Sequence, residues 1–136
     1  MDRFQHVIRW SMNSHFHKEQ FQVTRDIFTH QPIGMNFWVG SATPYVMKWE
    51  SGKEPDFQVL YMDPDTLLPL DLETYSFDLE RANVYNDPRW TRKYSIMESY
   101  DLPDMSPKSF HDFAQRIILE EEVAKKVRNH HRIDLD

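Results

Sequence analysis

Two histidines that stand one residue apart, in the segment NSHFHKEQF (13–21), are the side chains of this sequence best suited to metal chemistry. On an extended strand end, His15 and His17 would point their imidazoles to the same side. Imidazole nitrogens bind zinc, iron and manganese, so the pair could serve one metal ion or a pair of ions. A His-x-His pair alone equally fits two ordinary surface histidines. Glu19 and His30 are the nearest candidates for a further ligand.

Tyr45 is a second candidate site residue. It follows Pro44 in a loop after an apolar segment, and loops at strand ends often carry functional side chains because the scaffold holds them rigidly. Ser41 lacks a Gly-x-Ser-x-Gly context, and the three glycines form no phosphate-binding loop. The remaining histidines are weaker candidates, expected within helices (His6, His111) or in a frayed tail (His130, His131).

Composition limits the functions that this chain can have. Its 136 residues suffice for one domain, and its formal net charge of −6 disfavours binding to nucleic-acid phosphates. The absence of cysteine excludes disulfides and thiolate metal sites. The sequence has no apolar run of membrane-spanning length and no signal-peptide pattern. We therefore expect no nucleic-acid partner, no transmembrane segment and, if the chain is complete, an intracellular or organellar location.

The elements that must position the histidines are mostly strands. A short helix is predicted over 2–10, followed by an extended segment over 12–17. Apolar runs and alternations predict four strands, over 20–26, 33–42, 56–63 and 70–79. The last two should form a hairpin with DPD in its turn and a bulge near Glu73 or Thr74, where the apolar phase slips.

The remainder of the chain has helical patterns. The spacing of Trp90 and Tyr94 predicts a helix, and Ser106 followed by Pro107 predicts the start of a long amphipathic one. The order of helix, strands and helices indicates an α+β fold. We expect a strand-rich part over residues 1–80 and a helical region over residues 81–136.

This order of segments resembles one known family. SHFHKEQFQV, FWVGSATPYV, the hairpin FQVLYMDPDT…LDLETYSFDL and W…YSIMESYDLPDMSPKSFHDF follow one another as in the C-terminal half of acid-sphingomyelinase-like phosphodiesterases. These enzymes are a branch of the calcineurin-like metallophosphoesterases. The likeness is collinear over roughly residues 3–120. It implies the C-terminal portion of an αββα sandwich, and phosphodiester hydrolysis in which two metal ions activate a bridging water.

The resemblance also implies roles for individual residues. His15 and His17 match the histidines of the family's Gly-His-Thr-His motif, which bind the two metals, one each, with zinc the expected metal. Tyr45 matches the tyrosine of a Pro-Ser-x-Thr-x-Tyr loop that borders the active site and would contact substrate. Ser14 and Phe16 stand where the motif has glycine and threonine.

The family's earlier motifs, which carry most of the metal ligands, do not occur in this sequence. It contains no Asp-x-His, Gly-Asp or Gly-Asn. Two histidines cannot hold two metals, so we expect a chain that is catalytically incomplete alone. It would need a partner chain that supplies the missing ligands and covers the strand-rich half, where the strand over 33–42 would otherwise expose an apolar face or edge.

The alternative is a pseudoenzyme that serves as a structural or docking subunit of a larger complex. The cysteine-free composition and the absence of a signal peptide favour it, because typical members of the family are exported, lysosomal or secreted, and carry disulfides.

Overall fold

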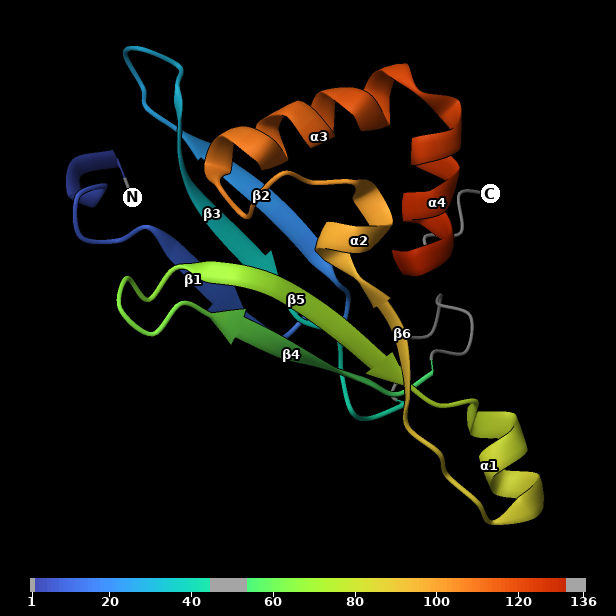
Figure 1. Cartoon of the computed structure of the whole chain (residues 1–136). Coiled ribbons are helices and arrows are strands. Elements are labelled where there is room, and N and C mark those ends of the chain that lie inside the picture. Colours follow the sequence, from blue (N-terminus) through green and yellow to red (C-terminus); the bar gives the residue numbers. More distant parts are fainter. Residues whose placement is uncertain (1, 45–53, 132–136) are drawn as a thin grey trace.

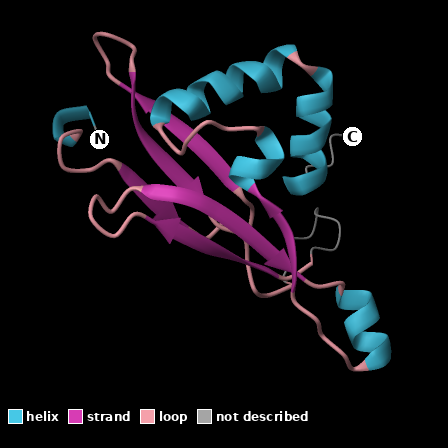
Figure 2. Cartoon of the chain, viewed as in Figure 1, coloured by secondary structure: helices cyan, strands magenta, loops and turns pink. Residues whose placement is uncertain are grey.

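A computed structural model describes residues 2–44 and 54–131 of the chain (Figure 1). Its elements in chain order are η1 (Asp2–Phe4), β1 (Trp10–Asn13), β2 (Gln20–Arg25), β3 (Pro32–Trp38), β4 (Asp56–Met62), β5 (Pro69–Ser76), α1 (Leu79–Tyr85), β6 (Thr91–Ser95), α2 (Ile96–Tyr100), α3 (Pro107–Leu119) and α4 (Glu121–His131). Helices α2, α3 and α4 gather beside the sheets, whereas α1 lies apart (Figure 2). The expected α+β class is confirmed, as the C-terminal portion of a sandwich-type fold with two small sheets.

The first sheet has the strand order β1-β3-β2. Strand β3 pairs in parallel with β1 and antiparallel with β2, so both of its edges are hydrogen-bonded. Its Met35 and Phe37 are each only 1% exposed, because α3 covers this face and packs Phe110 against Phe37 at a ring distance of 5.5 Å. The expectation that this strand exposes an apolar face or edge is therefore wrong.

The second sheet, in the order β4-β5-β6, contains the expected hairpin of β4 and β5. The irregularity expected near Glu73 or Thr74 is present, because the register of β5 against β6 shifts between Thr74 and Tyr75. The extra residue is Lys93 of β6, and Leu72, Thr74 and Ser76 of β5 are buried in unbroken alternation. The apparent slip of phase in the sequence comes from aromatic side chains on the outer face, where Phe57 stacks on Tyr75.

This outer face is a cluster of aromatic rings and polar groups. The rings of Phe57 and Tyr75 lie 5.3 Å apart, and Trp90 contacts Phe57 at 4.8 Å. Glu73 accepts a hydrogen bond from the Tyr75 hydroxyl at 3.0 Å. Tyr75 and Trp90 thus have packing partners although they point away from the core.

Two helix predictions need correction and one is confirmed. The predicted helix over 2–10 is only a 3₁₀ turn, since β1 already begins at Trp10. Trp90 and Tyr94 are not helical, because residues 91–95 pair with β5 as β6. Helix α3 begins as predicted, with Pro107 in its first turn and the Ser106 hydroxyl accepting from the Ser109 N–H at 3.2 Å.

The core lies between β3, β5, β6 and the helices α2 and α3. Its most buried large side chains include Tyr100, Phe110 and Phe113, and Tyr100 stacks on Phe113 at 4.5 Å. Phe21 of β2 also packs against Phe113, at 5.4 Å. Since burying one such side chain contributes about 1.5–3 kcal/mol, this aromatic cluster contributes several kcal/mol to the stability of the fold.

Gly40, two residues after the end of β3, lies against the first residue of β4 and so brings the two sheets close together. A Cβ at this position would lie 1.6 Å from Oδ1 of Asp56, the buried first residue of β4. The Asp56 N–H donates to the Ser41 carbonyl at 2.8 Å, which fixes the approach of the two segments. Any larger residue at this position would require the Asp56 side chain to move.

We predict that Gly40→Ala lowers the free energy of unfolding by about 2 kcal/mol, because overpacking costs roughly 1–3 kcal/mol. Urea denaturation measures this loss. In an Asp56→Ala background, which lacks the colliding carboxylate, Gly40→Ala should cost far less. Equal costs in the two backgrounds would show that the contact is not the cause.

Candidate functional site

The histidine pair lies in a loop that crosses the end of β3. Asn13, the last residue of β1, and Gln20, the first of β2, both pair with Trp38, one from each side. Residues 14–19 must therefore arch over the carboxyl end of the parallel pair β1 and β3. Side chains at the carboxyl ends of parallel strands are well placed to meet ligands.

The backbone of both histidines is left-handed, with φ of 95° at His15 and 56° at His17. The expectation of an extended segment over 12–17 is therefore wrong beyond Asn13, where β1 ends. Non-glycine residues rarely adopt positive φ, and the conformation costs roughly 1–3 kcal/mol at each position. His15 is exposed against the ring of Phe16, and His17 is half-buried.

The described residues do not complete a metal site around this pair. Within 2–44 and 54–131, no group of three or more histidine, aspartate or glutamate side chains is arranged to hold a metal ion. Glu19 is buried and accepts a hydrogen bond from the Tyr94 hydroxyl, and His30 lies exposed in the turn after β2. The histidines thus fit zinc chemically but as a partial ligand set. Tyr45, the predicted substrate contact, lies outside the described residues.

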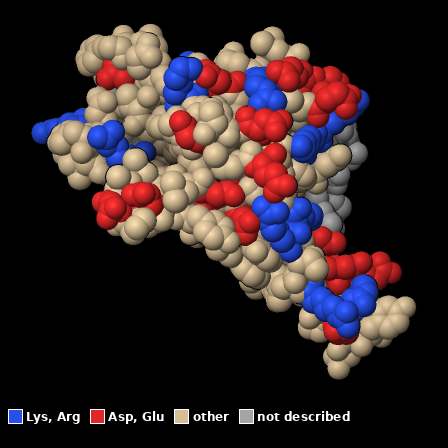
Figure 3. Space-filling model, viewed as in Figure 1, with Lys and Arg blue, Asp and Glu red and all other residues tan. Residues whose placement is uncertain are grey.

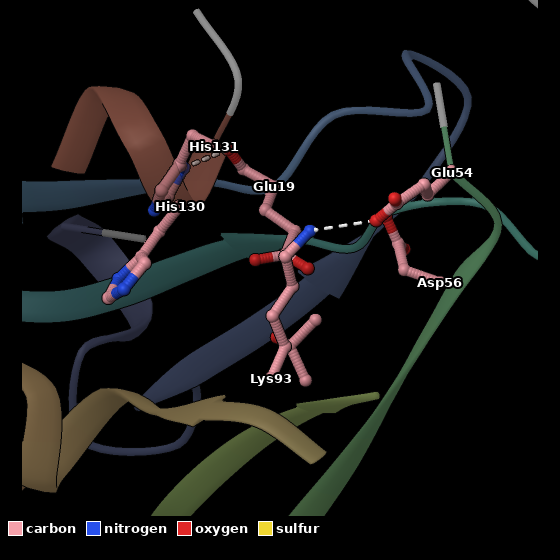
Figure 4. A pocket seen from close by; sticks show the side chains of 7 residues that line it. Glu19, Glu54, Asp56, Lys93, His130 and His131 are labelled. Carbon is pink, nitrogen blue, oxygen red and sulfur yellow. Dashed lines mark hydrogen bonds and ion pairs between the residues drawn. The ribbon is translucent and has the colours of Figure 1, made fainter. Parts of the chain in front are cut away.

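A polar pocket lies beside the loop (Figure 4). It is lined by Glu19, Glu54, Asp56, Thr74, Lys93, His130 and His131. Among the lining residues, Lys93 pairs with Glu54 at 3.2 Å. The lining residues come from the histidine loop, β4 and the segment just before it, β5, β6 and the end of α4, so the pocket is where these parts of the chain meet.

The end of α4 lines this pocket with His130 and His131. His130 stacks on Tyr94 at a ring distance of 4.3 Å, and its Nδ1 lies 2.9 Å from the Tyr100 hydroxyl. The Nδ1–H of His131 donates to the Glu19 carbonyl at 2.6 Å. The expectation of a frayed tail is therefore wrong for both histidines.

Burial shifts the titration of these groups. It lowers the pKa of His130 to about 4, with a smaller effect from the nearby charges of His131, Lys126 and Lys93. Burial likewise lowers the pKa of His131. Burial and the Glu19 carboxylate raise the pKa of Tyr94 well above its ordinary value. Both imidazoles are thus neutral at pH 7, and Tyr94 donates to Glu19.

A signal for these residues was present in the sequence. Val123 and Val127 pack against the core, and His130 and His131 follow at the next turn of the same helix face. The stripe of core-facing positions therefore continues to the end of α4. Histidine is polar enough to suggest exposure, but its ring also packs well against tyrosine.

A family model described as "Acid sphingomyelin phosphodiesterase C-terminal region" matches residues 31–132. The chain belongs to this family. The matched region begins just before β3 and ends after α4, so it contains the aromatic core and both pocket histidines. His15 and His17 lie upstream of it. The resemblance inferred from the order of the motifs is confirmed.

Several proteins of the same family are similar to this chain over most of its length. It is 31% identical to mouse acid sphingomyelinase-like phosphodiesterase 3b over 88% of this chain and 27% of that protein. It is 28% identical to rat cyclic GMP-AMP phosphodiesterase SMPDL3A over 85% and 26% of the two chains. With human sphingomyelin phosphodiesterase it shares 29% identity, over 85% and 18%. The chain thus spans about a quarter or less of the length of these relatives.

The surface of the protein carries both positively and negatively charged side chains. Lysine and arginine side chains are interleaved with aspartate and glutamate on the face shown in Figure 3, without a continuous basic area. Among the helices that the structure describes, none is both long and apolar enough to cross a membrane.

We predict that the protein loses stability as the pH falls from about 6.5 to about 4. His130 has its pKa lowered to about 4 in the folded state, whereas the unfolded chain binds a proton near the ordinary value of 6.5. The stabilisation is therefore complete above pH 6.5 and lost by pH 4. Melting temperatures measured between pH 7 and 5 should fall by a few degrees.

His130→Gln should flatten this dependence, because it removes the titrating ring. His30→Gln is the matched control, since His30 is exposed. If the two variants and the parent protein give parallel curves of melting temperature against pH, His130 is not the responsible group.

Proposed function

We propose that this chain is the C-terminal part of an acid-sphingomyelinase-like metallophosphodiesterase whose metal site is completed by polypeptide outside this sequence. The observation that carries the proposal is the loop that holds His15 and His17 at the carboxyl end of β1 and β3, both in left-handed conformation. Strained backbone of this kind clusters at ligand-binding sites, where the geometry of a side chain matters more than its local stability.

In this proposal His15 and His17 each hold one of two divalent transition metals, zinc being the first candidate. When bound, such metals polarise a phosphodiester and activate water. The chain's own contribution is to present two imidazole nitrogens and, through Tyr45, to border the substrate. The relatives are named for phosphodiesters as different as sphingomyelin and cyclic GMP-AMP, so we assign the substrate class as phosphodiesters.

The missing ligands and the surface of the chain favour a partner polypeptide over the strand-rich half. Large apolar side chains are exposed near the N-terminal segment and the β2–β3 turn: Phe4, Val7, Ile8, Ile27 and Phe28. The two segments adjoin, because the Gln5 side chain donates to Asp26 at 3.5 Å. An exposed apolar group of this size is typical of an interaction surface.

A second candidate function is that of a non-catalytic structural or docking subunit. Ser14 favours it, because a serine stands where the family motif has glycine. Its side chain adds a Cβ beside the proposed metal ligands. In this case the apolar surface would still bind a partner, but no metal would be needed.

The protein purified from its source, with any chain that accompanies it, distinguishes these functions. Native mass spectrometry with metal analysis should find two transition metals per complex and a chain with the missing motifs. His15→Ala and His17→Ala should each reduce hydrolysis of bis-p-nitrophenyl phosphate more than about 100-fold, since even residues that only support metal ligands are worth 10–100-fold.

His30→Ala is the matched control, because His30 is also a histidine with positive φ, 58°, in an exposed turn. It should keep both the metals and the activity. A metal-free complex of this chain with unrelated proteins would instead support the docking subunit.

A further inference from the structure

Glu19 is the residue where the histidine loop is fixed. It follows His17 by two positions and is the last residue before β2. Its side chain is only 7% exposed, although carboxylates are rarely buried without partners. The loop bearing the two histidines therefore ends in a buried acidic residue and not in a flexible connection.

Two residues from distant parts of the chain hold Glu19. The hydroxyl of Tyr94, in β6, donates to the Glu19 carboxylate. The Nδ1–H of His131, in the last turn of α4, donates to the Glu19 carbonyl at 2.6 Å. The bond from Tyr94 thus fixes the side chain, and the bond from His131, seen in Figure 4, fixes the backbone.

Tyr94 and His131 are themselves firmly placed. Tyr94 is 6% exposed and belongs to the core cluster. The ring of His130 stacks on Tyr94, so the end of α4 packs directly against the residue that bonds the Glu19 side chain. Because both donors belong to ordered elements, they transmit the position of the core to the loop.

Strained conformations persist only where the surrounding structure determines them from several sides. At the first end of the loop, the Val39 N–H donates to the Asn13 carbonyl at 3.0 Å and ties it to β3. At the second end, Glu19 provides the fixed point. The five residues between these ends, with left-handed His15 and His17, have little freedom to relax.

We propose that Glu19, Tyr94 and His131 form a positioning unit that holds the histidine loop in the conformation in which His15 and His17 meet their ligand. This role rests on the proposed function, in which the ligand is a pair of metal ions. It makes α4, far from the loop in sequence, part of the support of the site. Tyr94 and His131 act through Glu19 and do not touch the metals.

Hydrogen exchange with mass spectrometry tests the unit in the complete protein. Tyr94→Phe and His131→Ala should speed amide exchange in residues 14–18 about tenfold, the change expected for losing one hydrogen bond of roughly 1.4 kcal/mol. Peptides from α3 should keep their protection. His131→Asn should restore slow exchange, because its side-chain amide can donate to the same carbonyl.

Tyr61→Phe is the matched control. It also removes a hydroxyl bound to a glutamate, since Tyr61 donates to Glu73 at 3.0 Å, but on the outer face of the second sheet. Exchange in 14–18 should not change. Unchanged exchange in the Tyr94 and His131 variants, or equal acceleration in α3, would overturn the positioning role.

Metal release provides the second measurement. If zinc is bound, Tyr94→Phe and His131→Ala should transfer it to the chelator 4-(2-pyridylazo)resorcinol at least about tenfold faster than the parent protein. Faster exchange with unchanged release would overturn the role in presenting the ligands. A parent protein without metal would refute the proposed function instead, and the exchange rates alone would then decide whether the unit holds the loop.

Discussion

The pairing of Asn13 and Gln20 with the same residue, Trp38, is the constraint on which the site depends. It places β1 and β2 on opposite sides of β3, about two strand spacings or roughly 10 Å apart. A loop of six residues must bridge this distance while reversing the chain direction, and it does so with left-handed turns at His15 and His17. The geometry of the two histidines is therefore a consequence of strand pairing.

The stabilisation from the aromatic core offsets the cost of this backbone strain. Phe21 of β2, which follows the loop, and Phe37 of β3, whose end the loop crosses, pack against α3 through Phe110 and Phe113. Each buried ring contributes a few kcal/mol, which is comparable to the cost of the two strained residues together. The same strands thus supply both the stability and the site.

Structural features that depend on neighbouring residues can be predicted from this sequence, whereas features that depend on contacts between distant segments cannot. The Ser106 cap, the β4–β5 hairpin and the α+β class follow from neighbouring residues alone. The strand at 91–95 was mistaken for a helix because the Trp90–Tyr94 spacing fits both, and only pairing with β5 decides between them. The order of motifs identified the family. The left-handed histidines depend on strand pairing with β3 that no local pattern encodes. His130 and His131 continue the core-facing stripe of α4, but their partners Tyr94 and Glu19 lie in distant segments.

Helix α4 contains no fully buried residue between Glu121 and His131. It is held by partly buried valines and by the contacts of its last two histidines. Elements with few buried contacts open before the rest of a protein unfolds. If α4 supports the histidine loop, then warming would open α4 and release the loop while the sheets are still folded. Loss of function would then precede loss of fold, and the two would be separate transitions of one molecule.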